Sequence, residues 1–234
     1  VSDEVSHDFW RQFRKAVKNV KPNCAIIGEN WHDANVYLHG DQFDSIMNYA
    51  FTKACLDFFA FDRFNADEMS DKLNELLMRN TDPVNRMMLN LLDSHDTDRF
   101  LTRVNGNINK LMCAIALLYF YIGAACIYYG TENKMIGGFD PDCRRTFDWS
   151  LEEIDNPVKS LIRTLTQLKH NPDFDKNDIS IFSENDLLFI ERGNYQLIIN
   201  ESNQDQPIKS SQIIASNNYN NGILSTDGFL AQIN

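Results

Sequence analysis

The stretch "CAIIGENWHDANVYLHG", residues 24–40, decides the fold class, because its apolar run stops at Gly28 and gives way at once to acidic, aromatic and imidazole side chains. A strand that is apolar on both faces and ends in such side chains is typical of a parallel sheet where it opens into a binding cleft. The stretch therefore predicts a buried parallel strand over 24–29 that ends at Glu29.

The same pattern recurs along the first three quarters of the chain. Further apolar strands are expected over 43–48, 90–94 and 125–129, each with a polar end. Helical periodicity predicts helices over 6–21, 70–79, 108–123 and 156–170, the second of them capped by Ser70. Alternating strands and helices predict an α/β fold with a parallel sheet and its active loops at the carboxyl edge.

After residue 172 the sequence changes to short segments such as "LLFIERG" and "YQLIINES", separated by Asn, Asp, Gly and Ser. Such segments predict antiparallel strands. We therefore expect two domains: an α/β domain over 1–172 and a small antiparallel β domain over 173–234. The apolar run 111–130 is interpreted as a buried helix followed by a strand, because Gly123 splits it, so no membrane span is expected.

Composition excludes several classes of function. A formal net charge of −11 and the lack of a basic patch argue against nucleic acid as a partner. The five cysteines form an odd number without CxxC spacing, so buried thiols and a reducing, cytoplasmic location are expected. The polar start "VSDEVSHD" does not resemble a signal peptide.

Two strand ends supply the candidate chemistry. Glu29 ends the first, and "LLDSHDTDR" ends the third with His95 and Asp96. Each alone also fits a helix cap, an ion pair or a solvated loop. Together they fit paired carboxylates for acid/base work on an acetal, because sheet geometry brings strand ends into one cleft.

Other residues add to a carbohydrate interpretation, each beside a plainer structural one. Trp31 is either a packed core residue or a platform for a sugar ring. "DPDCRR" (140–145) is either a turn or a clamp for vicinal hydroxyls. No metal is expected, since adjacent His95 and Asp96 point apart on a strand and no second histidine follows at helical spacing. No cofactor is expected either.

The motifs "GENWHDA" (28–34), "LLDSHDTDRF" (91–100) and "YYGTENKMIGGFDPDCRRTFDW" (128–149), in this order, resemble the second half of an α-amylase superfamily enzyme, most similar to the neopullulanase and cyclomaltodextrinase group. The resemblance covers nearly the whole chain, and "GFLAQI" resembles the closing strand of the family's C-terminal β-sandwich. It implies the second half of a (β/α)8 TIM barrel followed by a small antiparallel β-sandwich domain.

The resemblance also implies residue roles. Glu29 matches the general acid/base, and Asp96 the carboxylate that stabilises the transition state, with His95 donating a hydrogen bond beside it. Asp140 and Arg144 match the DPxxR element that grips glucose, and Trp31 matches an acceptor-side platform. The remaining candidates for substrate binding are Glu4 and Tyr128.

One departure from the family pattern limits this assignment. The family's nucleophilic Asp ends the fourth barrel strand in a pattern like "GxRxDVxxE", and Val1 to Glu4 resemble the four residues just after that Asp. Nothing in the sequence places Asp3 on the required face as a substitute. The chain by itself is therefore expected to be inactive.

The implied function of the parent protein is retaining hydrolysis of α-glucans, namely maltooligosaccharides, cyclodextrins and, by further extension, pullulan. Two alternatives stay open: a non-catalytic glucan-binding or interaction fragment, and a sucrose- or trehalose-directed relative. A half-barrel has two unpaired strand edges, so the expected partner is the N-terminal half of the barrel, or a second copy paired through those edges.

Overall fold

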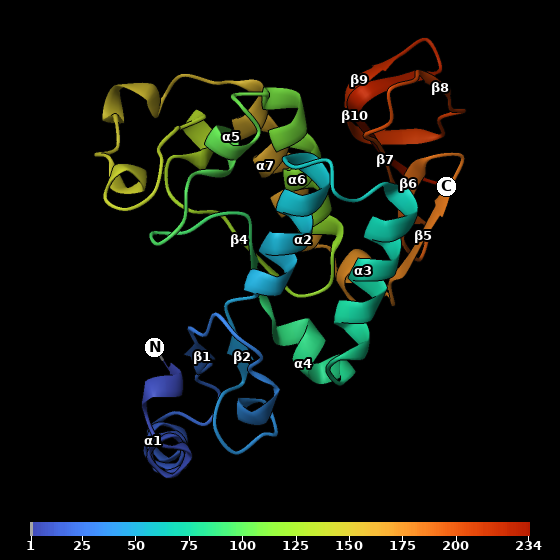
Figure 1. The fold of residues 1–234 in the computed structure, drawn as a ribbon. Coiled ribbons are helices and arrows are strands. Elements are labelled where there is room, and N and C mark those ends of the chain that lie inside the picture. Colours follow the sequence, from blue (N-terminus) through green and yellow to red (C-terminus); the bar gives the residue numbers. More distant parts are fainter. Residues whose placement is uncertain (1) are drawn as a thin grey trace.

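A computed structural model describes residues 2–234 and contains short strands that run parallel in the order β1-β2-β3-β4 (Figure 1). A bridge between Met47 and Leu89 joins the second strand to the third. The four predicted strands are therefore present, each shorter than its apolar run. Their bounds are β1 (Ile27–Gly28), β2 (Ser45–Ile46), β3 (Leu89–Leu91) and β4 (Ala124–Cys126).

Helices connect and follow these strands, and the expected helices over 6–21, 108–123 and 156–170 are confirmed. The α-helices are α1 (His7–Val20), α2 (Tyr49–Phe59), α3 (Ala66–Met78), α4 (Asp82–Met87), α5 (Phe100–Arg103), α6 (Ile108–Phe120), α7 (Pro157–Lys169) and α8 (Pro172–Asp175). Single 3-10 turns are η1 (Ser2–Glu4), η2 (Asn35–Tyr37), η3 (Thr131–Asn133), η4 (Asp142–Arg144) and η5 (Trp149–Leu151).

The start of α3 corrects one prediction. The helix begins at Ala66, where Asn65 and Glu68 form a reciprocal capping box with two hydrogen bonds of 2.9 Å. The predicted cap, Ser70, is wrong: it lies inside the helix, and its hydroxyl donates to the Asp67 carbonyl. The capping box satisfies two amide groups at once, so the helix extends one turn further toward its N-terminus.

Buried asparagines hold the short strands in register. The Asn48 amide N–H donates to the Leu89 carbonyl at 2.8 Å, and its side chain donates to Asn90 Oδ1 at 2.8 Å. Asn90 is fully buried and donates in turn to the Ile122 carbonyl at 2.7 Å. These bonds link β2 to β3 and to the segment before β4, where backbone pairing alone is brief.

The core centres on α6, in which every residue from Leu111 to Phe120 is buried. It lies among α2, α7 and the β domain (Figure 1). The predicted buried helix and following strand over 111–130 are therefore confirmed. Among residues 2–234, no helix combines the length and the apolar character that crossing a membrane requires. Of the five free cysteines, Cys55, Cys113 and Cys143 are buried.

The C-terminal region forms the expected antiparallel β domain, which packs beside α6 and α3 (Figure 1). Its long last strand, β10, pairs with three others, β7, β8 and β9, and so connects the whole domain. One set of side chains, including Phe229, joins the main core, and Leu224 and Leu230 belong to a small second core. The strands are β5 (Ser180–Glu184), β6 (Leu187–Arg192), β7 (Tyr195–Asn200), β8 (Gln206–Pro207), β9 (Gln212–Asn220) and β10 (Ile223–Ile233).

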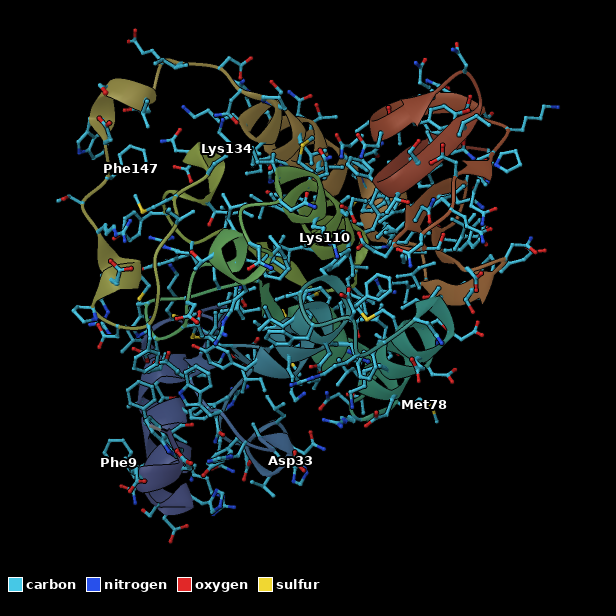
Figure 2. The ribbon with its side chains drawn as sticks, turned by 45° about the horizontal axis from the view of Figure 1, so that its top comes forward. Phe9, Asp33, Met78, Lys110, Lys134 and Phe147 are labelled. Carbon is cyan, nitrogen blue, oxygen red and sulfur yellow. The ribbon has the colours of Figure 1, made fainter. Side chains whose placement is uncertain are left out.

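Charged side chains meet where α6 joins the β domain. Lys110 is labelled in Figure 2. Its Nζ lies 3.4 Å from Glu201 Oε2, 3.5 Å from Asp62 and 3.9 Å from Asp227. Burial raises the pKa of Glu201 to about 8, and Asp227 adds to the rise while Lys110 opposes it. Removal from water thus outweighs the nearby ammonium at this carboxyl group.

A second buried charge, Arg99, fixes the long loop before α7. Its side chain is fully buried; Nε donates to the Cys143 carbonyl at 2.8 Å and Nη1 to the Tyr129 carbonyl at 2.6 Å. The guanidinium carbon lies 4.0 Å from the centre of the Tyr128 ring and 4.7 Å from that of Tyr129. Arg99 therefore attaches the first part and the middle of this loop to the start of α5.

Replacing Arg99 by lysine should lower the free energy of unfolding by about 2–4 kcal/mol, because a single ammonium cannot reach both carbonyls and leaves one buried acceptor unsatisfied. Urea unfolding followed by circular dichroism measures the change. The matched control is Arg103→Lys, whose half-exposed side chain pairs with Asp98 and should cost less than about 1 kcal/mol. Equal losses in the two variants would contradict this role.

The Glu201 carboxyl group should make stability pH-dependent. Its pKa rises from 4.5 to about 8 on folding, so the folded state binds more protons between these values, and its stability falls as pH rises from about 4.5 to 8. In Glu201→Gln, the free energy of unfolding should decrease by roughly 3–5 kcal/mol less over this pH range. Urea unfolding at several pH values tests this, with exposed Glu184→Gln as the control. An unchanged pH slope in Glu201→Gln would show that Glu201 titrates normally.

Candidate active site

Glu29 follows β1 directly, and its position depends on the glycine before it. A Cβ atom at Gly28 would lie 2.6 Å from the Phe43 ring, so only glycine lets the strand pass this ring. The Glu29 side chain is 31% exposed and therefore reachable from solvent at the strand end. The prediction that β1 delivers this carboxylate to the sheet edge agrees with the structure.

His95 and Asp96 follow β3 and lie beside Glu29. The expectation that these two side chains point apart is wrong, because they lie in a turn and not on a strand: His95 Nε2 is 3.2 Å from Asp96 Oδ2 and 3.7 Å from Glu29 Oε1. The backbone turns here because the Asp96 N–H donates to Ser94 Oγ at 3.2 Å. Two strand ends that are 67 residues apart in the sequence thus bring two carboxylates and an imidazole together.

Arg144 connects this cluster to the loop after β4. Its Nη2 lies 2.9 Å from Asp96 Oδ1, and its Nε lies 3.1 Å from Asp140 Oδ1 and donates to the His95 carbonyl at 2.8 Å. Asp140 and Arg144, predicted as a clamp, therefore lie at the same place as His95 and Asp96.

Trp31 lies in the loop after Glu29 and borders an open cavity of about 650 Å³. Its side chain is 47% exposed, which favours the platform interpretation over core packing. The same cavity is lined by Asp96 and Asp140, and by Phe139, which is 70% exposed. An aromatic face and carboxylate acceptors around one cavity suit a ligand with apolar ring faces and many hydroxyl groups.

The remaining two candidates for substrate binding are Glu4 and Tyr128. Glu4 is exposed in the turn η1, and the neighbouring Ser2 donates from both N and Oγ to the Glu29 carbonyl, at 3.3 and 3.1 Å. Tyr128 is partly buried, with the Arg99 guanidinium over its ring. Their roles in substrate binding stay predictions.

Tyr49 belongs to the site but does not appear among the sequence candidates. Its hydroxyl lies 3.3 Å from Glu29 Oε1 and 3.1 Å from Ser94 Oγ, and its ring stacks on Trp31 at 3.8 Å between centroids. The signal was available: "MNY" follows β2 at the carboxyl edge, as "GEN" follows β1.

The cluster can perform acid/base chemistry. The ligand atoms of Glu29, His95 and Asp96 lie within 4.8 Å of one another, which is also close enough for a cation. A carbohydrate site that works without a metal stays a prediction from the sequence.

Comparisons with known proteins agree with this geometry. The family described as "Alpha amylase, catalytic domain" matches residues 3–212. A cyclomaltodextrinase of Thermoanaerobacter pseudethanolicus is 44% identical over 169 residues, which cover 72% of this chain and 29% of that enzyme. Neopullulanase 2 of Thermoactinomyces vulgaris is 42% identical over 73% of this chain and 29% of its own length.

Solved structures of related enzymes match the whole chain. A cyclic α-maltosyl-(1→6)-maltose hydrolase from Arthrobacter globiformis, in complex with maltose, superposes with a TM-score of 0.87 and 28% identity, and the match covers 100% of this chain and 55% of that protein. The chain spans only about three tenths of the curated relatives that it matches. Its fold is the second half of a (β/α)8 barrel, followed in the sequence by a β domain, and the chain belongs to the α-amylase family.

Proposed function

We propose that this chain carries the acid/base half of the active site of a retaining α-glucan hydrolase. The observation that carries the proposal is that Glu29, Asp96 and Arg144 cluster around His95. Asp96 of this cluster lines the same cavity as Trp31. Maltooligosaccharides and cyclodextrins are the proposed substrates, with pullulan as an extension. The names of the cyclomaltodextrinase and neopullulanase relatives support this class.

The residues would divide the reaction as follows. Glu29 protonates the glycosidic oxygen as the bond to the anomeric carbon breaks, and later removes a proton from the attacking water. Asp96, held by Arg144 and His95, accepts hydrogen bonds from sugar hydroxyls and stabilises the positive charge of the transition state. Trp31 supports the ring on the acceptor side.

The covalent step needs a nucleophilic carboxylate that we propose lies outside this chain. Support comes from Ser2, which donates two hydrogen bonds to the Glu29 carbonyl, so the backbone at residue 2 lies beside that of the acid. An aspartate that ends an adjacent strand there would face Glu29 across the scissile bond. Without it, a covalent glycosyl intermediate of the retaining type has no attacking group.

The proposed partner is the first half of the barrel. Among residues 2–234, β1 pairs only with β2, and β4 only with β3, so each has one open edge. Beside the β1 edge, Phe9 and Phe13 on α1 are 51% and 41% exposed. The matched hydrolase has just under half of its length beyond the part that this chain covers. We therefore favour the first half of the barrel over a second copy as the partner that covers the open strand edges and the apolar helix face.

The site also supports one alternative, a glucan-binding fragment without catalysis, because Trp31, Asp140 and Arg144 need no nucleophile to hold a sugar. A sucrose- or trehalose-directed relative is less well supported, since the matched relatives are named for cyclomaltodextrin and pullulan. A reducing, cytoplasmic location remains our proposal, based on the three buried free thiols.

The test uses two forms of the protein: the chain by itself, and the chain fused behind the first barrel half of the Thermoanaerobacter cyclomaltodextrinase. Release of reducing sugar from maltotriose and β-cyclodextrin is measured for each. The chain alone should show no hydrolysis, whereas the fusion should hydrolyse both sugars. Glu29→Gln in the fusion should lower kcat by about 10²–10⁴-fold, the usual contribution of a general acid.

The matched control is Glu184→Gln, an exposed carboxyl group in the β domain, which should leave kcat unchanged. A folded fusion that binds maltotriose without turnover would favour the binding-fragment alternative and contradict the hydrolase. Hydrolysis by the chain alone that is lost in Glu29→Gln would instead contradict the proposal that the nucleophile lies outside this chain.

A further inference from the structure

Tyr49 lies between the two strand ends that deliver the catalytic carboxylates. It begins α2 just after β2, which pairs with β1 on one side and is bridged to β3 on the other. The tyrosine is 7% exposed, and its hydroxyl lies 3.3 Å from Glu29 Oε1 and 3.1 Å from Ser94 Oγ. One hydroxyl group therefore contacts both halves of the cluster.

The direction of these hydrogen bonds follows from protonation. Burial raises the pKa of Tyr49 to about 12, so the phenol keeps its proton at any working pH. The Tyr49 hydroxyl donates its one proton to Glu29 Oε1, so Ser94 donates to the phenolic oxygen. Ser94 Oγ also accepts the N–H of Asp96 at 3.2 Å, so the chain of bonds runs from the Asp96 backbone to the Glu29 carboxylate.

The ring of Tyr49 is held by the indole of Trp31. The two rings are nearly parallel, with 14° between their planes and 3.8 Å between their centroids. Trp31 thus has one face on Tyr49, while almost half of its surface remains exposed. A sugar that stacked on the free face would be fixed relative to Glu29 through the same tyrosine.

We propose that Tyr49 is a positioning residue, whose hydroxyl orients the Glu29 carboxylate and ties it to the Asp96 turn and to the Trp31 platform. The proposal rests on the proposed function for the catalytic role of Glu29. Besides Tyr49, the titratable groups close to Glu29 include His95, with Nε2 at 3.7 Å, and Asp96. These two remain when only the phenolic hydroxyl is deleted.

Tyr49→Phe tests this role, because it removes the hydroxyl and keeps the ring under Trp31. The ¹³C-carboxyl signal of Glu29, assigned by its loss in Glu29→Gln, is titrated in the chain labelled with ¹³C-glutamate. Loss of a donor to the ionised form should move its titration midpoint about 0.5–1 pH unit higher. In the fused enzyme, kcat should fall about 10-fold with KM changed less than 2-fold, and the alkaline limb of the rate profile should move by the same amount.

Tyr121→Phe is the matched control. It also removes a buried phenolic hydroxyl, which donates to the Leu73 carbonyl at 3.2 Å, but lies away from the site. It should lower stability without moving the Glu29 midpoint. If Tyr49→Phe fails to fold, Ser94→Ala removes the donor to Tyr49 and should move the midpoint in the same direction by less.

An unchanged midpoint together with an unchanged kcat in a folded Tyr49→Phe would overturn the positioning role. Failure of the proposed function gives a different result. The fused enzyme with the native Tyr49 would then show no hydrolysis, while the titration midpoint of Glu29 in the chain alone would still move in Tyr49→Phe.

Discussion

The register of four very short parallel strands is the constraint on which the site depends. Each strand contributes two or three paired residues, so a slip of one residue would turn Glu29 or Asp96 to the other side of the sheet. Asn48 and Asn90 oppose such a slip, because their buried amides find partners only in the observed register. The same Asn48 also caps α2 at the N–H of Phe51 and so sets the start of the helix that carries Tyr49.

The sequence predicts much of this arrangement for a physical reason. Apolar runs that end in charge mark the carboxyl edge of a parallel sheet. This rule identifies Glu29 at the end of one strand, and His95 and Asp96 at the end of another. It also placed the buried helix at α6, where the apolar residues form a continuous run. The start of α3 was missed because a capping box at Asn65 outweighs a single serine at Ser70.

What the sequence could not predict are contacts between segments. No periodicity indicates that Arg99 holds the loop of Tyr129 and Cys143, or that Arg144 reaches Asp96. Tyr49 was missed because tyrosine at the start of a helix is ordinary, and only the stacked Trp31 and the nearby Glu29 give it a role. The boundary expected at residue 172 coincides with the start of α8, and the division into domains remains a proposal.

The central claim is that these side chains form a glucan site, and the indole N–H signals of the three tryptophans test it most directly. Trp31 borders the cavity, whereas Trp10 lies in α1, donates to the Ser2 carbonyl and serves as an internal reference. During titration with maltotriose, our account predicts a saturable shift of the Trp31 signal with Trp10 unchanged. A Trp31 signal that stays fixed at saturating maltotriose would contradict the account.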